Sequence, residues 1–405
     1  MTCCRICGSD VHEFLDLGRQ PLANGFLTPE EVDDEYFYRL AVGACEACTM
    51  VQLTQEVPRD LKYHDGYPYH ASGSATHRAH FAGEARRLLA TELTGDDPFI
   101  VEIGCNDGVM LATIARAGVR HLGVEPAGAV GALAAAKGVR VRQDFFDEAV
   151  AEDVLTRHGP ADVVFGANTI CHIADLPSVL RGVTALLAED GVFVCTEPYL
   201  GTIVEGGAFD QIYDEHFYYF TARSVRAMAE RFGFDLVDVE EVPLHGGEIR
   251  YVLARGGRRE PAPSVAALIE KETAAGLADL GTLGGFRAAV DRVRADLPAL
   301  LRDIRDAGGT IVGYGAPGKV TTVTNLCRVG PDLVPFVVDS TPSKQGRLVP
   351  GTHIPVRPSE EFLSARPDHA VLFAWNHAPE IMAKERRFRA DGGRWVLYVP
   401  EVRVV

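Results

Sequence analysis

Two cysteine pairs near the start of the chain have the spacing of a metal site. Cys4 and Cys7 form one C-x2-C pair, and Cys45 and Cys48 form a second. Each pair places two thiolates on one tight turn, and two such turns offer an ion four sulfur ligands, which suits Zn²⁺. A closed four-thiolate site leaves no position for water, so we expect a structural zinc. Cys3 is an alternative first ligand without the right spacing to Cys7, and a redox pair is the alternative chemistry.

A glycine turn with acidic neighbours, at residues 102–108, could bind a cationic cofactor. Apolar residues typical of a buried strand precede it, and helical spacing follows it. The flanking carboxylates would repel an anionic pyrophosphate but not a sulfonium that carries an amino-acid tail. The alternative is a generic α/β turn without a ligand. The candidate cofactor-binding residues are Glu102, Gly104, Asn106, Gly108 and, at the end of the next strand where a ribose would lie, Glu125.

A third group that could do chemistry is Tyr213-Asp-Glu215-His216, inside an aromatic-rich segment. Histidine accepts a proton at neutral pH, and a nearby carboxylate can raise its basicity, so the group contains a candidate general base. Tyr67 lies in another irregular segment, residues 61–75, whose tyrosines and histidines suit the lining of a polar site. A structural histidine and a surface loop with packed tyrosines are the respective alternatives.

Alternating strands and helices must position these groups. Ligands of open α/β sheets bind at the carboxyl ends of strands, so Asn168 and His172, which follow the fourth strand, are site candidates. The order of elements predicts a right-handed parallel sheet closed by an antiparallel hairpin. The predicted strands are 98–103, 121–125, 139–143, 162–167 and 191–198, the helices are 109–117, 176–187 and 222–232, and the hairpin is 234–240 with 249–255.

A second strand, glycine turn and helix follow a long helical stretch at residues 264–306. The spacing G-x-G-x-x-G at residues 313–318 matches a dinucleotide fingerprint, and Asp339 ends the next strand where the acidic partner would fall. A lone match is weak evidence, so it predicts a smaller Rossmann-like domain that need not hold a cofactor. Lys319 and the amides of the turn could instead hold the diphosphate of a nucleotide-linked substrate.

The composition limits the partners and the compartment. The formal net charge is −16, so binding along a nucleic-acid backbone would need a basic patch, and the sequence contains none. No apolar run reaches the length of a transmembrane span, and the chain starts with cysteines rather than a signal region. We therefore expect a cytoplasmic protein with no membrane partner. Cysteines in a reducing compartment indicate thiolate chemistry or burial rather than disulfides.

Taken together, the motifs resemble those of the three-domain sugar C-methyltransferases of deoxysugar biosynthesis, over essentially the whole chain. The resemblance implies an α/β protein with a zinc-binding domain at 1–70, a class I S-adenosylmethionine (SAM) methyltransferase domain at 71–257, and a Rossmann-like domain at 258–405. The motifs that carry it are the two C-x2-C pairs, Glu102-Ile-Gly-Cys-Asn-Asp-Gly108, Asp214-Glu-His-Phe217, His245-Gly-Gly-Glu248, Gly313-Tyr-Gly-Ala316 and Ala374-Trp-Asn-His377.

The resemblance also implies roles for individual residues. His216 is the expected base, with His172 as the other candidate, and Glu215 would orient His216 or hold its charge. Tyr213, Tyr67 and His172 would position the sugar or stabilise an enolate oxygen. Beside the glycine turn, Asp144 would face the adenine amine and Asn168 would lie near the methyl donor. The expected substrate-binding residues are His245, Lys319, Tyr314, Asn376 and His377.

The reaction that the resemblance implies is methyl transfer from SAM to C-3 of a thymidine-diphosphate (TDP)-linked 4-keto-2,6-dideoxyhexose, including 3-amino forms. The C-4 ketone acidifies the C-3 hydrogen, a base removes it, and C-3 attacks the methyl group. We expect a monomer or a weak homo-oligomer. Three other interpretations stay open. They are O- or N-methylation of a sugar or small molecule, an NAD-dependent enzyme that uses residues 313–318, and a non-catalytic zinc-containing scaffold.

Overall fold

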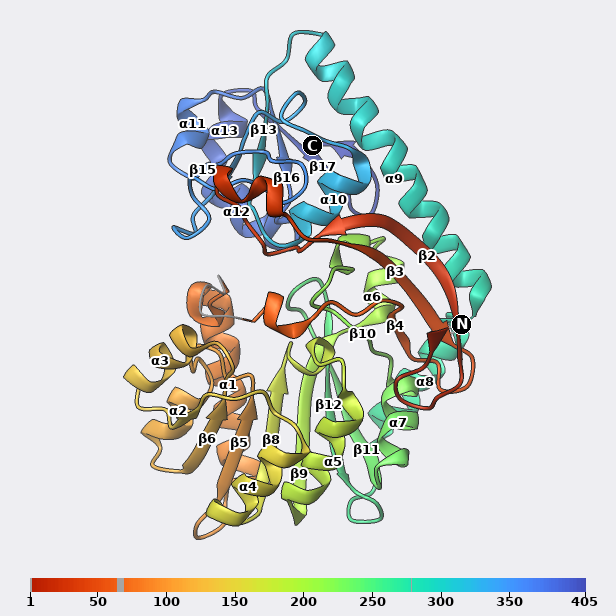
Figure 1. Ribbon diagram of the computed structural model, residues 1–405, viewed down its shortest axis with the longest axis vertical. Coiled ribbons are helices and arrows are strands. Elements are labelled where there is room, and N and C mark those ends of the chain that lie inside the picture. The colour runs from red at the N-terminus through yellow and green to blue at the C-terminus, as the bar shows by residue number, and fades with distance from the viewer. Residues whose placement is uncertain (1, 64–68, 278) are drawn as a thin grey trace.

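The computed structural model describes residues 2–63, 69–277 and 279–405. Within these residues the chain forms three sheets, and Figure 1 shows them arranged around a common centre. The middle sheet lies below, the C-terminal sheet above, and the long N-terminal strands run between them beside a long helix. No helix in the described part of the chain is both long enough and apolar enough to cross a membrane.

The N-terminal sheet is antiparallel and includes a strand from the middle of the chain. Its order is β1-β2-β3-β4-β10, and in β10 Tyr218 pairs with Gln52 and Tyr219 with Val51 of β4. The aromatic-rich segment around His216 therefore continues directly into a sheet that the N-terminal residues build. The bounds are β1 (Thr2–Cys3), β2 (Asp10–Pro21), β3 (Phe37–Cys45), β4 (Val51–Leu53) and β10 (Tyr218–Tyr219).

The middle sheet confirms the predicted doubly wound architecture. Its order is β11-β12-β9-β8-β5-β6-β7, with β12 antiparallel to both neighbours and β5 to β9 parallel. The central strand β5 is buried along its whole length, which explains its unbroken apolar character apart from Glu102. The strands are β5 (Phe99–Ile103), β6 (Arg120–Val124), β7 (Val141–Arg142), β8 (Ala161–Ala167), β9 (Leu187–Pro198), β11 (Phe234–Val242) and β12 (Glu248–Arg255).

Side-chain caps fix where several helices of the middle part begin. Ser74, Asp147, Asp175 and Thr221 each accept a hydrogen bond from the backbone amide three residues later, which satisfies one free amide of the first turn. Thr221 caps the helix that the sequence predicts at 222–232. The helices are α1 (Ala75–Thr91), α2 (Leu111–Arg116), α3 (Gly128–Ala136), α4 (Glu148–His158), α5 (Leu176–Leu186), α6 (Leu200–Glu205) and α7 (Ala222–Arg231).

The C-terminal part contains a parallel sheet with an antiparallel edge, in the order β15-β14-β13-β16-β17-β18. The strands are β13 (Ile311–Tyr314), β14 (Val337–Asp339), β15 (Val356–Pro358), β16 (His369–Leu372), β17 (Arg394–Leu397) and β18 (Arg403–Val404). The main helices are α9 (Leu280–Asp306), which packs along β2, and α10 (Lys319–Cys327), with α11 (Glu361–Ser364), α12 (Ala378–Lys384) and α13 (Arg386–Ala390) around them.

The helical stretch predicted at 264–306 is not continuous. It divides into α8 (Pro263–Ala274) and α9, because Gly276 takes a left-handed conformation with φ of +61° that ends the first helix. The predicted fold class is otherwise confirmed. The domain boundaries at 70 and 257 remain predictions, and β10 shows that the N-terminal sheet draws on residues far beyond the first of them.

A buried ion pair attaches α1 to the middle sheet and generates a stability prediction. Arg250 Nε donates to Glu84 Oε1 at 2.7 Å, with side-chain exposures of 8% and 5%. Replacing Arg250 by Met leaves a buried carboxylate unpaired, so we expect a loss of about 3–5 kcal/mol in the free energy of unfolding, measured by denaturant titration.

An exposed pair between the same helix and the neighbouring strand serves as the control. Arg87 and Glu240 have side-chain exposures of 41% and 46%, so Arg87→Met should cost about 0–1 kcal/mol. The double variant Arg250→Met, Glu84→Gln should recover most of the stability that the first substitution loses. Equal losses for Arg87→Met and Arg250→Met would contradict the assignment of the buried pair.

Candidate active site

A cavity of about 1390 Å³ opens at the carboxyl ends of the middle strands, and all three parts of the chain line it. Asn24 reaches it from the N-terminal part, Gly104 and His216 from the middle part, and Lys319 from the C-terminal part. This volume exceeds that of an ordinary single-ligand pocket and suits two molecules that react with each other. Both candidate cofactor residues and candidate base residues face this one space.

The first glycine turn is shaped by contacts that exclude side chains. Gly104 has φ of +67°, and a Cβ there would lie 2.5 Å from Thr169 Cγ2. Gly108 has φ of +74°, and its Cβ would lie 2.9 Å from the Cβ of Ala134. The glycines therefore allow the left-handed backbone of the turn and its close packing against Thr169 and Ala134.

Two carboxylates lie on this turn and suit a cationic ligand. Glu125 accepts hydrogen bonds from the amides of Asn106 and Ala127, each at 2.9 Å, which fixes the turn. Glu102 is buried, and its Oε2 has no hydrogen-bond partner among the described residues. Burial, and next the charge of Glu125, raise the pKa of Glu102 well above its usual range. A sulfonium bound nearby would favour its ionised form, so the pair fits SAM.

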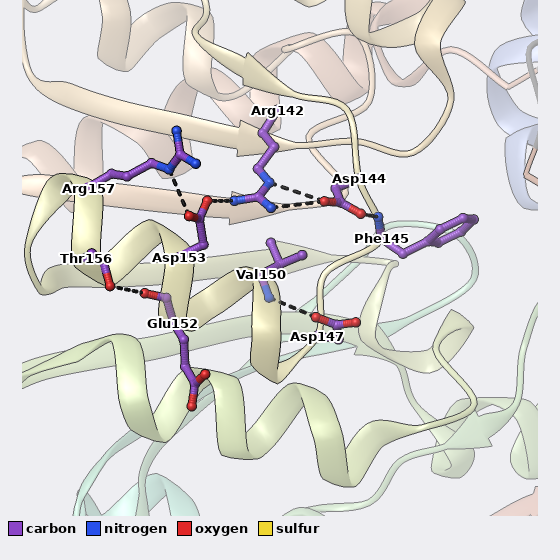
Figure 2. A network of polar contacts seen from close by, with 9 residues as sticks. All are labelled: Arg142, Asp144, Phe145, Asp147, Val150, Glu152, Asp153, Thr156 and Arg157. Carbon is purple, nitrogen blue, oxygen red and sulfur yellow. Dashed lines mark hydrogen bonds and ion pairs between the residues drawn. The ribbon is translucent and has the colours of Figure 1, made fainter.

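Asp144, predicted to face the adenine amine, makes polar contacts within the chain. Its Oδ2 accepts from the Arg142 guanidinium, at 3.1 Å from Nη2 and 3.3 Å from Nε, and its Oδ1 accepts from the amide of Phe145. Figure 2 shows this carboxylate turned toward Arg142, which also binds Asp153. Asp144 is not among the cavity-lining residues, whereas Phe145 is. A contact between Asp144 and adenine therefore stays a prediction.

His216 has the geometry of a neutral general base. Its Nδ1 lies 2.8 Å from the carbonyl oxygen of Gln211, and its Nε2 lies 2.9 Å from the hydroxyl of Tyr213. Because a carbonyl oxygen only accepts, Nδ1 carries the proton and Nε2 keeps a lone pair, which accepts from Tyr213. Burial lowers the pKa of His216 to about 3, against the Gln211 bond, which raises it. The imidazole is therefore neutral, and its Nε2 can accept a proton.

The role predicted for Glu215 is only partly matched by its contacts. Glu215 lines the cavity, and its Oε1 accepts from Asn24 Nδ2 at 2.7 Å. The group that orients the His216 ring in the structure is instead the Gln211 carbonyl. Sequence reasoning did not identify Gln211, because a backbone carbonyl carries no side-chain signal. Tyr67, predicted to position the sugar, lies outside the described residues.

His172 stacks on His216 and is the second imidazole of the site. The ring centroids are 5.1 Å apart with an interplanar angle of 28°, and Tyr63 also stacks on His172, with centroids 6.2 Å apart. His172 Nε2 has no hydrogen-bond partner among the described residues, and burial lowers the pKa of the ring. Cys171, His172 and His216 offer ligand atoms within 4.8 Å of one another. Stacked rings direct their in-plane lone pairs side by side, which does not favour a shared metal ion.

The five predicted substrate-binding residues come from the middle and C-terminal parts of the chain. His245, Lys319, Tyr314, Asn376 and His377 all line the cavity. His245 Nδ1 lies 2.5 Å from Glu248 Oε1 and 3.4 Å from Asn168 Nδ2. The Tyr314 hydroxyl donates to Glu385 at 2.8 Å, so it is already engaged.

Lys319 is the strongest candidate among these residues for a contact with an anion. It is buried, its Nζ lies 4.5 Å from the centroid of Trp375, and it has no hydrogen-bond partner among the described residues. Burial lowers the pKa of Lys319, while Asp210 and Glu248 raise it. A bound phosphate would satisfy this ammonium group and stabilise its charge.

The second glycine turn is engaged by the protein itself. Asp339, the expected ribose-binding acid, accepts from the amides of Ala316 at 2.6 Å and Thr341 at 2.7 Å. A Cβ on Gly318 would lie 3.2 Å from Asn24 Nδ2, so the third glycine makes room for the N-terminal segment. Both features disfavour the NAD-dependent alternative, because the fingerprint positions serve contacts within the chain.

The four predicted zinc ligands come together. Cys4 Sγ lies 3.5 Å from Cys48 Sγ, Cys7 Sγ lies 3.4 Å from Cys45 Sγ, and all four sulfurs are within 4.8 Å of one another. A tetrahedron with Zn–S bonds of about 2.3 Å has edges of about 3.8 Å, so the cluster fits zinc. The four thiolates would hold the ion and keep β3 and β4 joined at their turn.

We expect the purified chain to contain one zinc ion and to depend on it for stability. Cys45→Ser should remove the metal and lower the unfolding temperature, because metal binding contributes folding free energy. Zinc content by atomic absorption and thermal unfolding by circular dichroism measure these effects. Cys3→Ser, next to the cluster, should keep full zinc content. Zinc loss in Cys3→Ser would instead favour Cys3 as a ligand.

Comparison with known proteins agrees with this arrangement. Residues 4–63 match a family model described as "Putative zinc binding domain", residues 75–239 one described as "Methyltransferase domain", and residues 243–400 one described as "C-methyltransferase C-terminal domain". The chain is 36% identical over 411 residues to C-methyltransferase NovU of Streptomyces niveus. The aligned region covers 99% of this chain and 96% of NovU.

Other similarities are confined to part of the chain. The ubiquinone biosynthesis O-methyltransferase of Methylobacterium nodulans is 30% identical over 118 residues, 28% of this chain and 45% of that relative. The structure of magnesium protoporphyrin IX methyltransferase from Synechocystis with bound SAM aligns at 12% identity and a TM-score of 0.33, over 44% of this chain and 79% of that one. By its full-length similarity to NovU, the chain belongs to the family of SAM-dependent C-methyltransferases that carry an N-terminal zinc-binding domain.

Proposed function

We propose that this enzyme transfers a methyl group from SAM to C-3 of a TDP-linked 4-keto-2,6-dideoxyhexose, with or without an amino group at C-3. The observation that carries the proposal is the placement of an unprotonated His216 Nε2 in the same cavity as the acidic glycine turn and the buried Lys319. His216 Nε2 would take the proton of a carbon acid, the acidic glycine turn would hold the methyl donor, and Lys319 would contact the phosphate of the substrate.

SAM, when bound at the glycine turn, supplies an electrophilic methyl group. His216 Nε2 removes the proton from the carbon next to the C-4 ketone, and Gln211 holds the resulting imidazolium through Nδ1–H. The Tyr213 hydroxyl, 2.9 Å from Nε2, is positioned to donate to the enolate oxygen once that nitrogen is protonated. His172 Nε2, which has no hydrogen-bond partner among the described residues, is available to the sugar.

Substrate binding would strengthen the base. In the free enzyme the charge of Lys319 contributes to the lowered pKa of His216. Burial is the main cause of that lowered pKa, and a diphosphate bound to Lys319 would offset the smaller contribution of the lysine charge, which favours proton uptake by His216. The enzyme would thus keep a weak base until the nucleotide is in place.

The substrate is a small molecule, and we propose that the protein works in the cytoplasm as a monomer or weak homo-oligomer. We also propose 1–70, 71–257 and 258–405 as domain limits. The residues Glu102, Gly104, Asn106, Gly108, Glu125 and Asn168 are proposed for SAM, and His245, Lys319, Asn376 and His377 for the sugar nucleotide.

Isotope loss tests the position of methylation. With SAM and two TDP-4-keto sugars, one deuterated at C-3 and the other at C-5, we expect products that are heavier by one methylene, with deuterium lost from the first and kept in the second, measured by mass spectrometry. Loss of deuterium from C-5, the other carbon beside the ketone, would assign methylation to that side instead. Retention at both carbons would contradict carbon methylation and favour O- or N-methylation.

Replacement of each histidine tests the identity of the base. His216→Asn should lower kcat by about 10²–10⁴-fold, because it removes general-base catalysis. SAM affinity, measured by calorimetry, should stay unchanged. His172→Asn should have the smaller effect on kcat. Near-normal turnover by His216→Asn, together with a large loss in His172→Asn, would transfer the role of base to His172.

A further inference from the structure

We infer that Asn24, a residue of the zinc-containing part, is a positioning residue of the active site that holds the Glu215 carboxylate in place. The inference rests on the proposed function insofar as Glu215 acts on the substrate or on His216. It assigns the N-terminal part a direct share in the site, beyond binding a structural metal.

The segment around Asn24 is held by both other parts of the chain. The amide of Ala23 donates to Asp214 Oδ1 at 2.8 Å, and the hydroxyl of Thr321 donates to the carbonyl oxygen of Ala23 at 2.9 Å. Ala23 is buried, with 1% of its surface exposed. The backbone at residue 23 is thereby fixed between the residues before His216 and the first turn of α10.

Asn24 extends from this fixed backbone into the cavity. Its Nδ2 donates to Glu215 Oε1 at 2.7 Å, a short bond of the kind that a charged acceptor makes. Gly318 of the second glycine turn leaves the space that the Asn24 side chain occupies, since a Cβ there would lie 3.2 Å from Nδ2. The amide therefore has one defined position between Glu215 and the C-terminal turn.

The residues that follow Glu215 are also attached to the N-terminal part. The amide of Leu53 donates to the carbonyl oxygen of Phe217 at 2.9 Å, and β10 then pairs with β4. Lys62 Nζ donates to the carbonyl oxygen of Asp214 at 3.1 Å and lies 4.1 Å from the centroid of Phe217. The backbone on both sides of Glu215 is thus set by the N-terminal part, and Asn24 fixes the side chain itself.

Substitution of Asn24 tests this role. Asn24→Ala removes a hydrogen bond to a charged group and should lower kcat by about 10- to 100-fold. KM for SAM, zinc content and unfolding temperature should stay as in the wild type. Asn24→Asp places a second carboxylate against Glu215, so its loss at pH 7.5 should exceed that of Asn24→Ala and should shrink at lower pH, as one carboxylate of the pair takes up a proton. A normal kcat in Asn24→Ala would overturn the inference.

Two threonines of α10 provide a matched control. Thr321 and Thr324 are both buried, and each hydroxyl donates to a carbonyl oxygen, but only Thr321 bonds to Ala23, whereas Thr324 bonds to Val320 in its own helix at 2.7 Å. Thr321→Val should lower kcat in the same direction as Asn24→Ala, while Thr324→Val should leave kcat unchanged. Equal kcat losses in both variants would point to a general effect of the helix and would count against the inference.

Hydrogen exchange separates this inference from the proposed substrate. In Asn24→Ala the amides of residues 213–217 should exchange faster than in the wild type, with no ligand present. If the wild type methylates none of the keto sugars offered, the proposed function fails, and faster exchange still supports the positioning role. If the wild type is active and exchange and kcat are both unchanged in Asn24→Ala, the positioning role fails alone.

Discussion

The hydrogen bond between His216 Nδ1 and the Gln211 carbonyl is the interaction on which the chemistry of this site depends. It selects one tautomer and directs the lone pair of Nε2 toward Tyr213. Burial alone would only make the ring neutral. The carbonyl adds direction, and it supplies a partner for the proton that remains when Nε2 becomes charged. A backbone atom is well suited to this task, since it cannot titrate and moves little.

The rest of the architecture brings two unlike ligands to that nitrogen. The middle sheet presents a turn with two carboxylates, Glu102 and Glu125, whereas the C-terminal part presents the buried ammonium of Lys319. In a chain with a net charge of −16, the proposed function would use these opposite charges to separate a cationic donor from an anionic substrate across one cavity. Glu102 Oε2 and Lys319 Nζ are buried and have no hydrogen-bond partner among the described residues. A bound ligand of opposite charge would lower the electrostatic cost of burying each of them.

Local patterns predicted the features that depend on local chemistry. The zinc-binding cysteines, the glycine turn at Gly104 and the parallel middle strands with their closing hairpin were predicted from short motifs and periodicity, and the structure agrees with them. The pairing of Asp144 with Arg142, two residues earlier, was not predicted. Gln211 acts through its backbone, and Asn24 meets Glu215 across 191 positions of sequence. Neither contact leaves a trace in local spacing, so only the tertiary structure reveals it.

The membership of β10 in the N-terminal sheet has a consequence for synthesis on the ribosome. β4 is at the edge of its sheet until residues 218–219 emerge, far later in translation. During that interval the nascent chain presents an unpaired strand, which is the kind of edge that recruits other strands. The N-terminal sheet is therefore complete only after the middle part has been synthesised as far as β10. A fragment that ends near residue 70 would carry this open edge permanently, and an exchange of modules between relatives would have to move β10 together with β4.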